Sequence, residues 1–445
     1  MRKSSILIVI ALFISACVSN TPEPNPLSAS DQIATIVAST LAAMNTQLPA
    51  TEVPATPTPP MDGFSINGQL QGTLAFIRNN NLWIKINSVE YQLTNDADPS
   101  DIGLPRLWYS NPQISPDGTK IGYLKNAGTN VRTLMIYDIK SRNMTQIAND
   151  AAWVPPAVEW SNDSQKIYYP VSNGFDMTTG LETIVVKSIN LATGEVQEQG
   201  QYGVQTGCGG GSPDPANGIS NLENVGPFGG NVFSLSPQNN FLIHTTSCTS
   251  FGLGILNLAA QQDQVLDDYA SRAVISPDGS KIAAVSDNNI ITFNVNTGGI
   301  ESKFPTTGTP RALLWSADGK AILYSTSSLI NTVTLDDNVA LDLFGSAPTA
   351  FKLNVSTLWV VSLDSGQSNK IIEVEAHDLK PIFVKGQKVL VVIVENANKL
   401  FDYVNQGNRD NLTDYYPTSN IVEVDLANSS SNTILNNARQ AVYFK

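Results

Sequence analysis

The stretch NPQISPDGTKIGYL, residues 111–124, decides the fold, because much of the chain consists of altered copies of it. It reads as a β-strand, a tight turn at residues 115–118 and a second strand with β-branched and aromatic residues. The copies are AVISPDGSKIAAVS from Ala273, LLWSADGKAILYST from Leu313 and, in weaker form, VEWSNDSQKIYYP from Val158 and FSLSPQNNFLIHT from Phe233. The chain is therefore predicted to repeat one strand–turn–strand unit.

The turn has a physical basis. Pro116 fixes φ at the first corner, Asp117 can bond its own backbone, and Gly118 supplies the positive φ that closes the hairpin. One such tetrapeptide is weak evidence, but five aligned turns between similar strands indicate a repeat protein. The serines that open the turns are at 115, 161, 236, 276 and 316, and the last two intervals are 40 residues each. That spacing matches the roughly 40–45 residues of a four-stranded propeller blade.

Composition supports an all-β chain and excludes one class of partner. Of 445 residues 42% are hydrophobic, which is enough for a large core, and only 15% are charged. The formal charge is -13; without Arg2 and Lys3 the chain has 24 basic and 39 acidic residues, or -15. Because such a surface repels phosphate backbones, nucleic acid is not an expected partner.

Residues 1–16 read as a signal peptide. Arg2 and Lys3 precede an apolar run, residues 6–14, that is too short to span a bilayer. The run ends in Ile-Ser-Ala-Cys at residues 14–17, which resembles the lipobox of bacterial lipoproteins.

The lipobox resemblance implies a diacylglyceryl group on the Cys17 sulfur, cleavage before Cys17 and N-acylation, with palmitate as a typical chain. Several acyl chains would anchor the protein firmly on the extracytoplasmic side of the cell envelope. Val18, in place of an aspartate, favours the outer membrane in a two-membrane cell. The alternative is an ordinary secretory signal with an incidental cysteine.

Residues 17–62 are predicted to be a tether. The segment is rich in Thr, Ala and Ser and contains the prolines 22, 24, 26, 49, 54, 57, 59 and 60, so an extended, solvated chain is expected. Residues 28–47 place apolar side chains at helical spacing, which favours either a short self-associating or membrane-lying helix or a transient helix in a spacer. We favour the spacer, because isolated helices of this length are marginal.

Residues 63–445 are predicted to form a β-propeller. Residues 72–96 contain three strands without an incoming first strand, and the C-terminal AVYFK, residues 441–445, is a strand without partners after it. These pieces fit one blade closed by both ends of the chain, which removes exposed sheet edges. With the five turns and a last unit from Pro381, the count is seven blades. Six or eight remain alternatives, because the pattern fades at 200–231 and 327–355.

The repeated turn, its K-I-x-Y strand and the third strand LMIYDIKSRNMTQI, residues 134–147, resemble TolB-type, WD-repeat-like propellers. The resemblance covers residues 63–445. It implies the fold and a role in binding other proteins or surface polymers, and it supplies no catalytic residues.

The long connections are expected to share one side of the propeller. In a four-stranded blade the a–b and c–d turns lie on one side, and the b–c and d–a connections on the other. The segments 96–111, 149–157, 172–182, 200–231, 327–355 and 396–420 are all assigned to b–c or d–a connections. Loops on a rigid scaffold carry binding residues. Candidate ligand-binding aromatics there are Trp108, Tyr109, Trp153, Phe228, Tyr403, Tyr415 and Tyr416, with mutual packing as an equally weighted alternative.

Catalytic and metal-binding patterns are sparse. Cys208 and Cys248 are predicted to form a disulfide on the loop-rich side, with two free thiols as the alternative. His244 lies within a strand and is expected to be packed. The chain contains no Gly-x-Ser-x-Gly and no zinc-ligand spacing, so no metal or cofactor is expected. The acid pairs at 336–337 and at 410 and 414 lack calcium-loop spacing.

The sequence thus predicts an envelope-anchored propeller that binds a protein or an exported polysaccharide through its loop-rich face. The competing prediction is a polysaccharide-active enzyme that uses carboxylates in the propeller funnel, for which two converging carboxylates would be needed.

Overall fold

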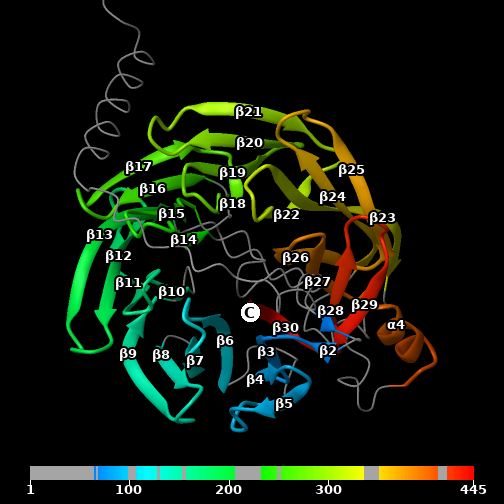
Figure 1. Ribbon diagram of the computed structural model, residues 1–445, viewed down its shortest axis with the longest axis horizontal. Helices are drawn as coiled ribbons and strands as arrows, with labels where there is room; N and C mark the ends of the chain where they lie inside the picture. The colour runs from blue at the N-terminus through cyan, green and yellow to red at the C-terminus, as the bar shows by residue number, and fades with distance from the viewer. Residues whose placement is uncertain are drawn as a thin grey trace, which may run out of the picture.

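A computed structural model describes residues 65–66, 69–98, 107–127, 131–152, 157–205, 232–247, 252–334, 350–408 and 418–444. Seven four-stranded antiparallel sheets form a ring around a common centre (Figure 1), so the predicted seven-bladed β-propeller is confirmed. We number the blades 1–7 from the N-terminal one and letter the strands of each blade a–d from the centre outward. A separate two-stranded sheet, β1 (Ser65–Ile66) with β2 (Gln69–Leu70), precedes the ring.

The strands of each blade, in the order a–d, follow the chain except in blade 1. Blade 1 contains β30 (Arg439–Phe444), β3 (Thr73–Arg78), β4 (Asn81–Ile86) and β5 (Val89–Gln92). Blade 2 contains β6 (Leu107–Ile114), β7 (Lys120–Ala127), β8 (Val131–Asp138) and β9 (Met144–Ala151). Blade 3 contains β10 (Glu159–Trp160), β11 (Lys166–Asp176), β12 (Leu181–Asn190) and β13 (Val196–Gln205). Blade 4 contains β14 (Phe233–Leu235), β15 (Phe241–Thr245), β16 (Leu253–Asn257) and β17 (Gln262–Asp267).

The remaining blades repeat this order. Blade 5 contains β18 (Ser271–Ile275), β19 (Lys281–Ser286), β20 (Asn289–Asn294) and β21 (Ile300–Pro305). Blade 6 contains β22 (Pro310–Trp315), β23 (Ala321–Thr334), β24 (Ala350–Ser362) and β25 (Ser368–Glu375). Blade 7 contains β26 (Asp378–Lys385), β27 (Lys388–Val394), β28 (Ser419–Asp425) and β29 (Ser431–Leu435).

Both ends of the described chain close the ring, as predicted. The C-terminal β30 pairs antiparallel with β3, and Thr73 lies opposite Phe444. The guanidinium of Arg78 donates to the carbonyls of Asn436 and Asn437 at 2.8 and 2.9 Å. Strand a of blade 1 therefore comes from the last residues of the chain, which leaves no sheet edge at the junction.

The five repeated turns all connect strand a to strand b. Gly118 and Gly279 adopt φ of 71° and 70°, as predicted, and the weaker copies use Ser164 at 61° and Asn239 at 56°. The opening serine accepts and donates within the turn: in blade 5, Ser276 Oγ accepts from the Lys281 backbone at 2.9 Å and donates to Asp278 at 2.6 Å. These contacts explain why the serine persists in all five copies.

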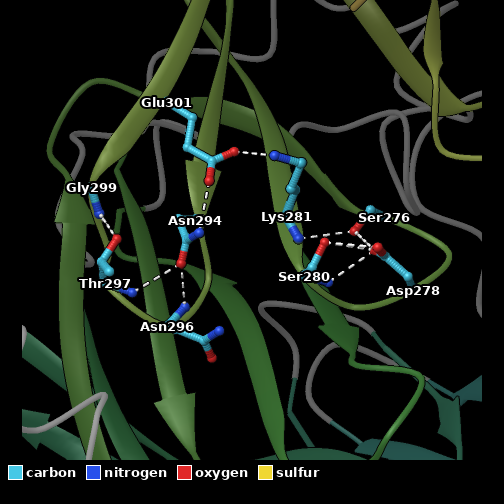
Figure 2. A network of polar contacts seen from close by, with 9 residues as sticks. All are labelled: Ser276, Asp278, Ser280, Lys281, Asn294, Asn296, Thr297, Gly299 and Glu301. Carbon is cyan, nitrogen blue, oxygen red and sulfur yellow. Dashed lines mark hydrogen bonds and ion pairs between the residues drawn. The ribbon is translucent and has the colours of Figure 1, made fainter.

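The c–d turn of blade 5 lies beside its a–b turn, and Figure 2 shows the contacts between them. Asn294 accepts from the backbone of Asn296 at 2.9 Å and donates to Glu301 at 2.7 Å, and Glu301 also pairs with Lys281 of strand b. We call the side of the ring with these short turns the turn side, and the opposite side, with the b–c and d–a connections, the loop side.

The core lies between neighbouring blades. Tyr123, Tyr169 and Tyr324, from the K-I-x-Y strands or their copies, are almost fully buried. The indole of Trp160 donates to the Gln113 carbonyl of the preceding blade at 3.0 Å, so polar contacts also join strands a of successive blades. Burial of the repeated apolar positions therefore holds the blades together.

Candidate functional site

Two of the expected loops on the loop side are extended hairpins. In blade 3, β11 and β12 stay paired as far as Asp176 opposite Leu181, so the expectation of a loop at 172–182 is wrong. In blade 6, β23 and β24 stay paired as far as Thr334 opposite Ala350, so much of 327–355 is also strand. In blade 6, β-branched residues continue along the extension of β23 and favour strand there.

The connection between β27 and β28 of blade 7 contains a helix, α4 (Asn398–Asn405), which the prediction of an all-β chain did not include. Phe401 and Val404 lie three positions apart and are buried, so one face of the helix is covered by the rest of the protein. Tyr403, a predicted ligand-binding residue, lies in α4 and is half-buried. Of the predicted ligand-binding aromatics in this connection, Tyr403 is the one within the described residues, and it lies on the loop side.

Blades 6 and 7 are joined on the loop side. The Asn396 side chain accepts from the Asn354 backbone N–H at 3.0 Å and donates to the Asn354 carbonyl at 2.8 Å. The His377 carbonyl, in the d–a connection, accepts from Ser327 at 2.9 Å and from the Asn354 side chain at 3.2 Å. These contacts show that the b–c segments of both blades and one d–a segment meet on one side of the ring.

Trp108 and Tyr109, which were predicted to be ligand-binding aromatics of a loop, are buried in a strand. Both lie in strand β6 rather than in a loop, with 6% and 4% of their surface exposed. Tyr109 donates to Asp96 at 2.7 Å and contacts the ring of Tyr123, so burial and the neighbouring carboxylate raise its pKa far above the usual range. Both residues serve the core, because their alternation places them against neighbouring blades.

Several predicted site residues lie outside the described residues: Cys17, Trp153, Cys208, Phe228, Cys248, Tyr415 and Tyr416. The acid pairs at 336–337 and at 410 and 414 lie outside them as well. The flanks of the two predicted disulfide partners do meet, since Gln205 and Ser247 form a parallel bridge and the Gln205 N–H donates to Thr246 O at 2.8 Å. The disulfide itself stays a prediction.

Glu159 is a carboxyl on an innermost strand. It opens β10, and it accepts a hydrogen bond from the Leu235 backbone on the innermost strand of blade 4. Burial raises the pKa of Glu159 to about 8, so the group is mostly protonated at neutral pH. A protonated carboxyl at this place can donate a hydrogen bond or a proton.

The innermost strands of blades 5, 6 and 7 bring three charged side chains together. Arg311 of β22 donates through Nε to Asp378 Oδ2 of β26 at 2.9 Å. Asp378 Oδ1 accepts from the Leu379 backbone at 2.9 Å. Burial and then repulsion from Arg311 lower the pKa of Arg272 in β18, while Asp378 acts in the opposite direction. This cluster, Arg272–Arg311–Asp378, has an excess of one positive charge.

His244 is packed, as predicted from its position in a strand. Its Nε2 lies 2.7 Å from an oxygen of Asp263, and its Nδ1 lies 3.2 Å from the carbonyl of Thr245. The imidazole is fully buried and stacks on Tyr202 of blade 3, with 3.7 Å between the ring centroids. Each ring nitrogen lies within hydrogen-bond distance of an oxygen of the protein, and the imidazole packs between blades 3 and 4.

In the described part of the chain no group of His, Cys, Asp and Glu is arranged to hold a metal ion. Within those same residues, no helix has the length and hydropathy needed to cross a membrane.

The chain is a β-propeller by its own sheet topology, and its resemblance to known proteins is remote. No protein-family model and no curated protein matches its sequence. Among solved structures it is similar to TolB from Acinetobacter baumannii, with 13% identity, a TM-score of 0.39 and coverage of 85% of this chain and 68% of TolB.

Two further structures resemble the chain at a similar level. An oligogalacturonate lyase in complex with manganese has 12% identity and a TM-score of 0.48, over 84% of this chain and 86% of the lyase. The tricorn protease also has 12% identity and a TM-score of 0.48, over 82% of this chain and 34% of the protease. Similarity this low concerns the propeller architecture, and it supports no inference about binding or catalysis.

The charged residues of the innermost strands were not predicted as site residues. Their signal in the sequence is a charge inside an otherwise apolar first strand, as in SRAVIS from Ser271, PRALLW from Pro310 and VEWS from Val158. Because strand a borders the centre of the ring, a charge there can meet charges from the first strands of other blades.

Proposed function

We propose that this protein is an envelope-anchored propeller that binds a protein or polysaccharide of the cell envelope through its loop side. The supporting observation is the asymmetry of the ring. The turn side has short turns of two to five residues, as between Lys385 and Lys388 or between Trp315 and Ala321, and five of its a–b turns are copies of one motif. The loop side has two extended hairpins and a helix, each different. Connections that vary on one side of a rigid scaffold are where recognition concentrates.

Capture of the partner tests this proposal. Purified protein is immobilised and exposed to a detergent extract of the native envelope and to its polysaccharide fraction. The variant Tyr403→Ala/Tyr415→Ala/Tyr416→Ala is expected to lose at least tenfold of the capture, since aromatic anchors dominate such interfaces. The matched turn-side variant Lys166→Ala/Lys320→Ala is expected to capture normally. If capture survives the first change and fails in the second, with both proteins folded, the choice of side is wrong.

Anchoring is tested separately at Cys17. The proposal that Cys17 is lipidated predicts that Cys17→Ala releases the protein from membranes or leaves an uncleaved precursor. Membrane fractionation and the mass of the processed chain measure both effects. Unchanged partition with normal processing would contradict the lipid anchor without affecting the proposed binding role.

Glu159 favours a second candidate function, cleavage of a polysaccharide, for which it would supply the proton-donating member of the two carboxyls that this chemistry needs. A carboxyl with a pKa of about 8 is suited to donate a proton to a leaving group at neutral pH. Incubation with envelope polysaccharide should then release new reducing ends, and Glu159→Gln should abolish that release while capture persists. Polysaccharide that stays intact with wild-type protein would exclude this candidate.

A further inference from the structure

The innermost strand of blade 5 contains a strained arginine. Arg272 adopts φ of 52°, a conformation that costs a non-glycine residue energy, at a bulge between Ser271 and Val274. Bulges of this kind redirect a side chain and are frequent beside functional sites. The bulge therefore gives the Arg272 side chain a direction that it would not have in a regular strand.

Blades 1 and 2 have the same kind of bulge in their innermost strands, with an uncharged amide side chain in place of the arginine. Asn111 of β6 and Gln440 of β30 also adopt positive φ at bulges, of 52° and 49°. The Gln440 side chain accepts from the Asn111 backbone N–H at 2.9 Å, so the side chain at one bulge satisfies the backbone at the other. In blade 5 the amide is replaced by a guanidinium, which cannot accept a hydrogen bond and adds a full charge.

The Arg272 guanidinium is incompletely satisfied by the protein. Its Nε is shielded from solvent, and within the described part of the chain no acceptor is bonded to that atom. The nearest carboxylate, Asp378, is already shared by Arg311 and the Leu379 backbone. An unpaired buried donor on a cation is costly, and an added anion would remove that cost.

We propose that the Arg272–Arg311–Asp378 cluster binds the carboxylate of a small organic monoanion, such as a sugar acid. The guanidinium fork matches the two oxygens of a carboxylate, which can accept from Arg272 and from the N–H groups of Arg311 that face away from Asp378. This site involves residues on the innermost strands and goes beyond the loop-side role proposed above.

Charge selects a monoanion over other anions. Two guanidiniums and one carboxylate leave an excess of one positive charge, which one carboxylate neutralises and a dianion such as sulfate or phosphate monoester exceeds. The whole chain has a formal charge of -13, so a polyanionic polymer is repelled before it reaches the cluster. A small ligand with a single carboxylate fits both conditions.

Titration with sodium glucuronate tests the proposal, with glucose and sodium sulfate as comparison ligands at constant ionic strength. We expect glucuronate to bind by calorimetry and to raise the melting temperature, glucose to have no effect, and sulfate to bind more weakly. Arg272→Gln should raise the dissociation constant for glucuronate at least tenfold, since it removes a charge-assisted pair. Arg142→Gln, at an exposed arginine of the turn side, should bind like the wild type.

The behaviour without ligand separates a binding role from a structural one. If Arg272 is kept for a ligand, Arg272→Gln and Arg272→Met should melt at or above the wild-type temperature, because an uncompensated buried charge is removed. Arg272→Lys should fold and bind with intermediate affinity, since it keeps the charge and loses the fork. Equal glucuronate binding by wild type and Arg272→Gln would overturn the proposal, as would no binding by wild type. Binding of polyglucuronate or of an acidic peptide in preference to glucuronate would overturn the choice of a small ligand.

Discussion

The turn side and the loop side of the propeller differ in how their sequence is constrained. On the turn side, each of five a–b turns repeats one small set of contacts, in which a serine bonds the chain that follows it and the carboxylate or amide beside it. On the loop side, the b–c connections of blades 3, 6 and 7 are a short hairpin tip, a long hairpin and a helix. The comparison indicates that the repeated turns belong to the scaffold, whereas these three connections differ from blade to blade.

Blade 4 shows how far the repeat can change and still fold. Its turn, Ser236 to Asn240, lacks the aspartate of the other four copies and the glycine of three of them. Ser236 donates to the Asn240 side chain at 2.6 Å instead, and Asn239 takes positive φ. Asparagine tolerates this conformation better than most residues, so the geometry persists after the motif has decayed.

The largest effect is expected at Gly118. Gly118 and Gly180 have the same φ of 71°, but they lie on the turn side and the loop side respectively. A β-carbon at Gly118 would overlap the ring of Phe444 on the closing strand, whereas at Gly180 nothing lies within 4 Å. We expect Gly118→Val to lower the free energy of unfolding by about 3 kcal/mol or more and Gly180→Val by about 1 kcal/mol, from strain alone.

Urea unfolding of both glycine variants measures this difference. The Gly279→Val variant should fall between them, because the neighbouring group there is the flexible side chain of Gln238, which can move away. Equal midpoints for the Gly118 and Gly180 variants would show that closure by β30 adds nothing to the cost.

A smaller effect is expected from the repeated serine. Ser276→Ala removes the acceptor for the Lys281 backbone and the donor to Asp278, which should cost about 1–2 kcal/mol. Ser172→Ala is the matched change on the loop side, where the hydroxyl of exposed Ser172 donates to Glu182 at 2.5 Å. That variant should change the free energy of unfolding by less than about 0.5 kcal/mol. If the two serines prove equivalent by denaturant unfolding, the repeated turns are not the more constrained side.

The sequence predicted the scaffold because the scaffold is local. Pro116, Asp117 and Gly118 specify their turn through their own dihedral preferences, and the apolar strands beside them follow from alternation. The closing strand was also predictable, since an unpaired C-terminal strand and a three-stranded N-terminal unit complete each other. Each of these inferences needs only neighbouring residues or a count of strands.

The loop side and the innermost cluster depend on contacts between blades, which a single sequence does not display. Trp108 and Tyr109 are residue types that are common in binding loops, yet both are buried in β6, which pairs with β7. The helix α4 is too short to be stable alone, and the burial of Phe401 and Val404 within the folded chain stabilises it. Arg272 and Arg311 are 39 residues apart and meet only because successive blades place their first strands side by side.

Acid should weaken the turn side more than the loop side. Hydrogen bonds from the turn serine and from the Ser280 backbone lower the pKa of Asp278, and serine bonds lower the pKa of Asp163 and Asp318 in the same way. A lowered folded-state pKa stabilises the protein above the unfolded-state value near 3.8, and the contribution is lost as pH falls through the folded-state pKa. Stability should therefore decline below about pH 4. Asp278→Asn should cost about 0.5 kcal/mol at pH 7 and flatten the decline measured by urea unfolding between pH 6 and 3. If the free energy of unfolding of Asp278→Asn falls with pH in parallel with that of the wild type, groups other than Asp278 cause the acid sensitivity.

The smallest effect on stability is expected at the tip of the blade 3 hairpin. Met177 is 86% exposed, between β11 and β12, and it contributes almost nothing to the core. Met177→Ser should therefore change the free energy of unfolding by less than about 0.5 kcal/mol. Exposed Phe175 and Leu181 flank it, so the three side chains give the tip an apolar surface that water does not favour. If the loop side binds the partner, the same substitution should lower capture severalfold while the melting temperature stays constant. Capture and stability that both stay constant would remove this hairpin from the binding surface and leave α4 and its connection as the part of the loop side that recognises the partner.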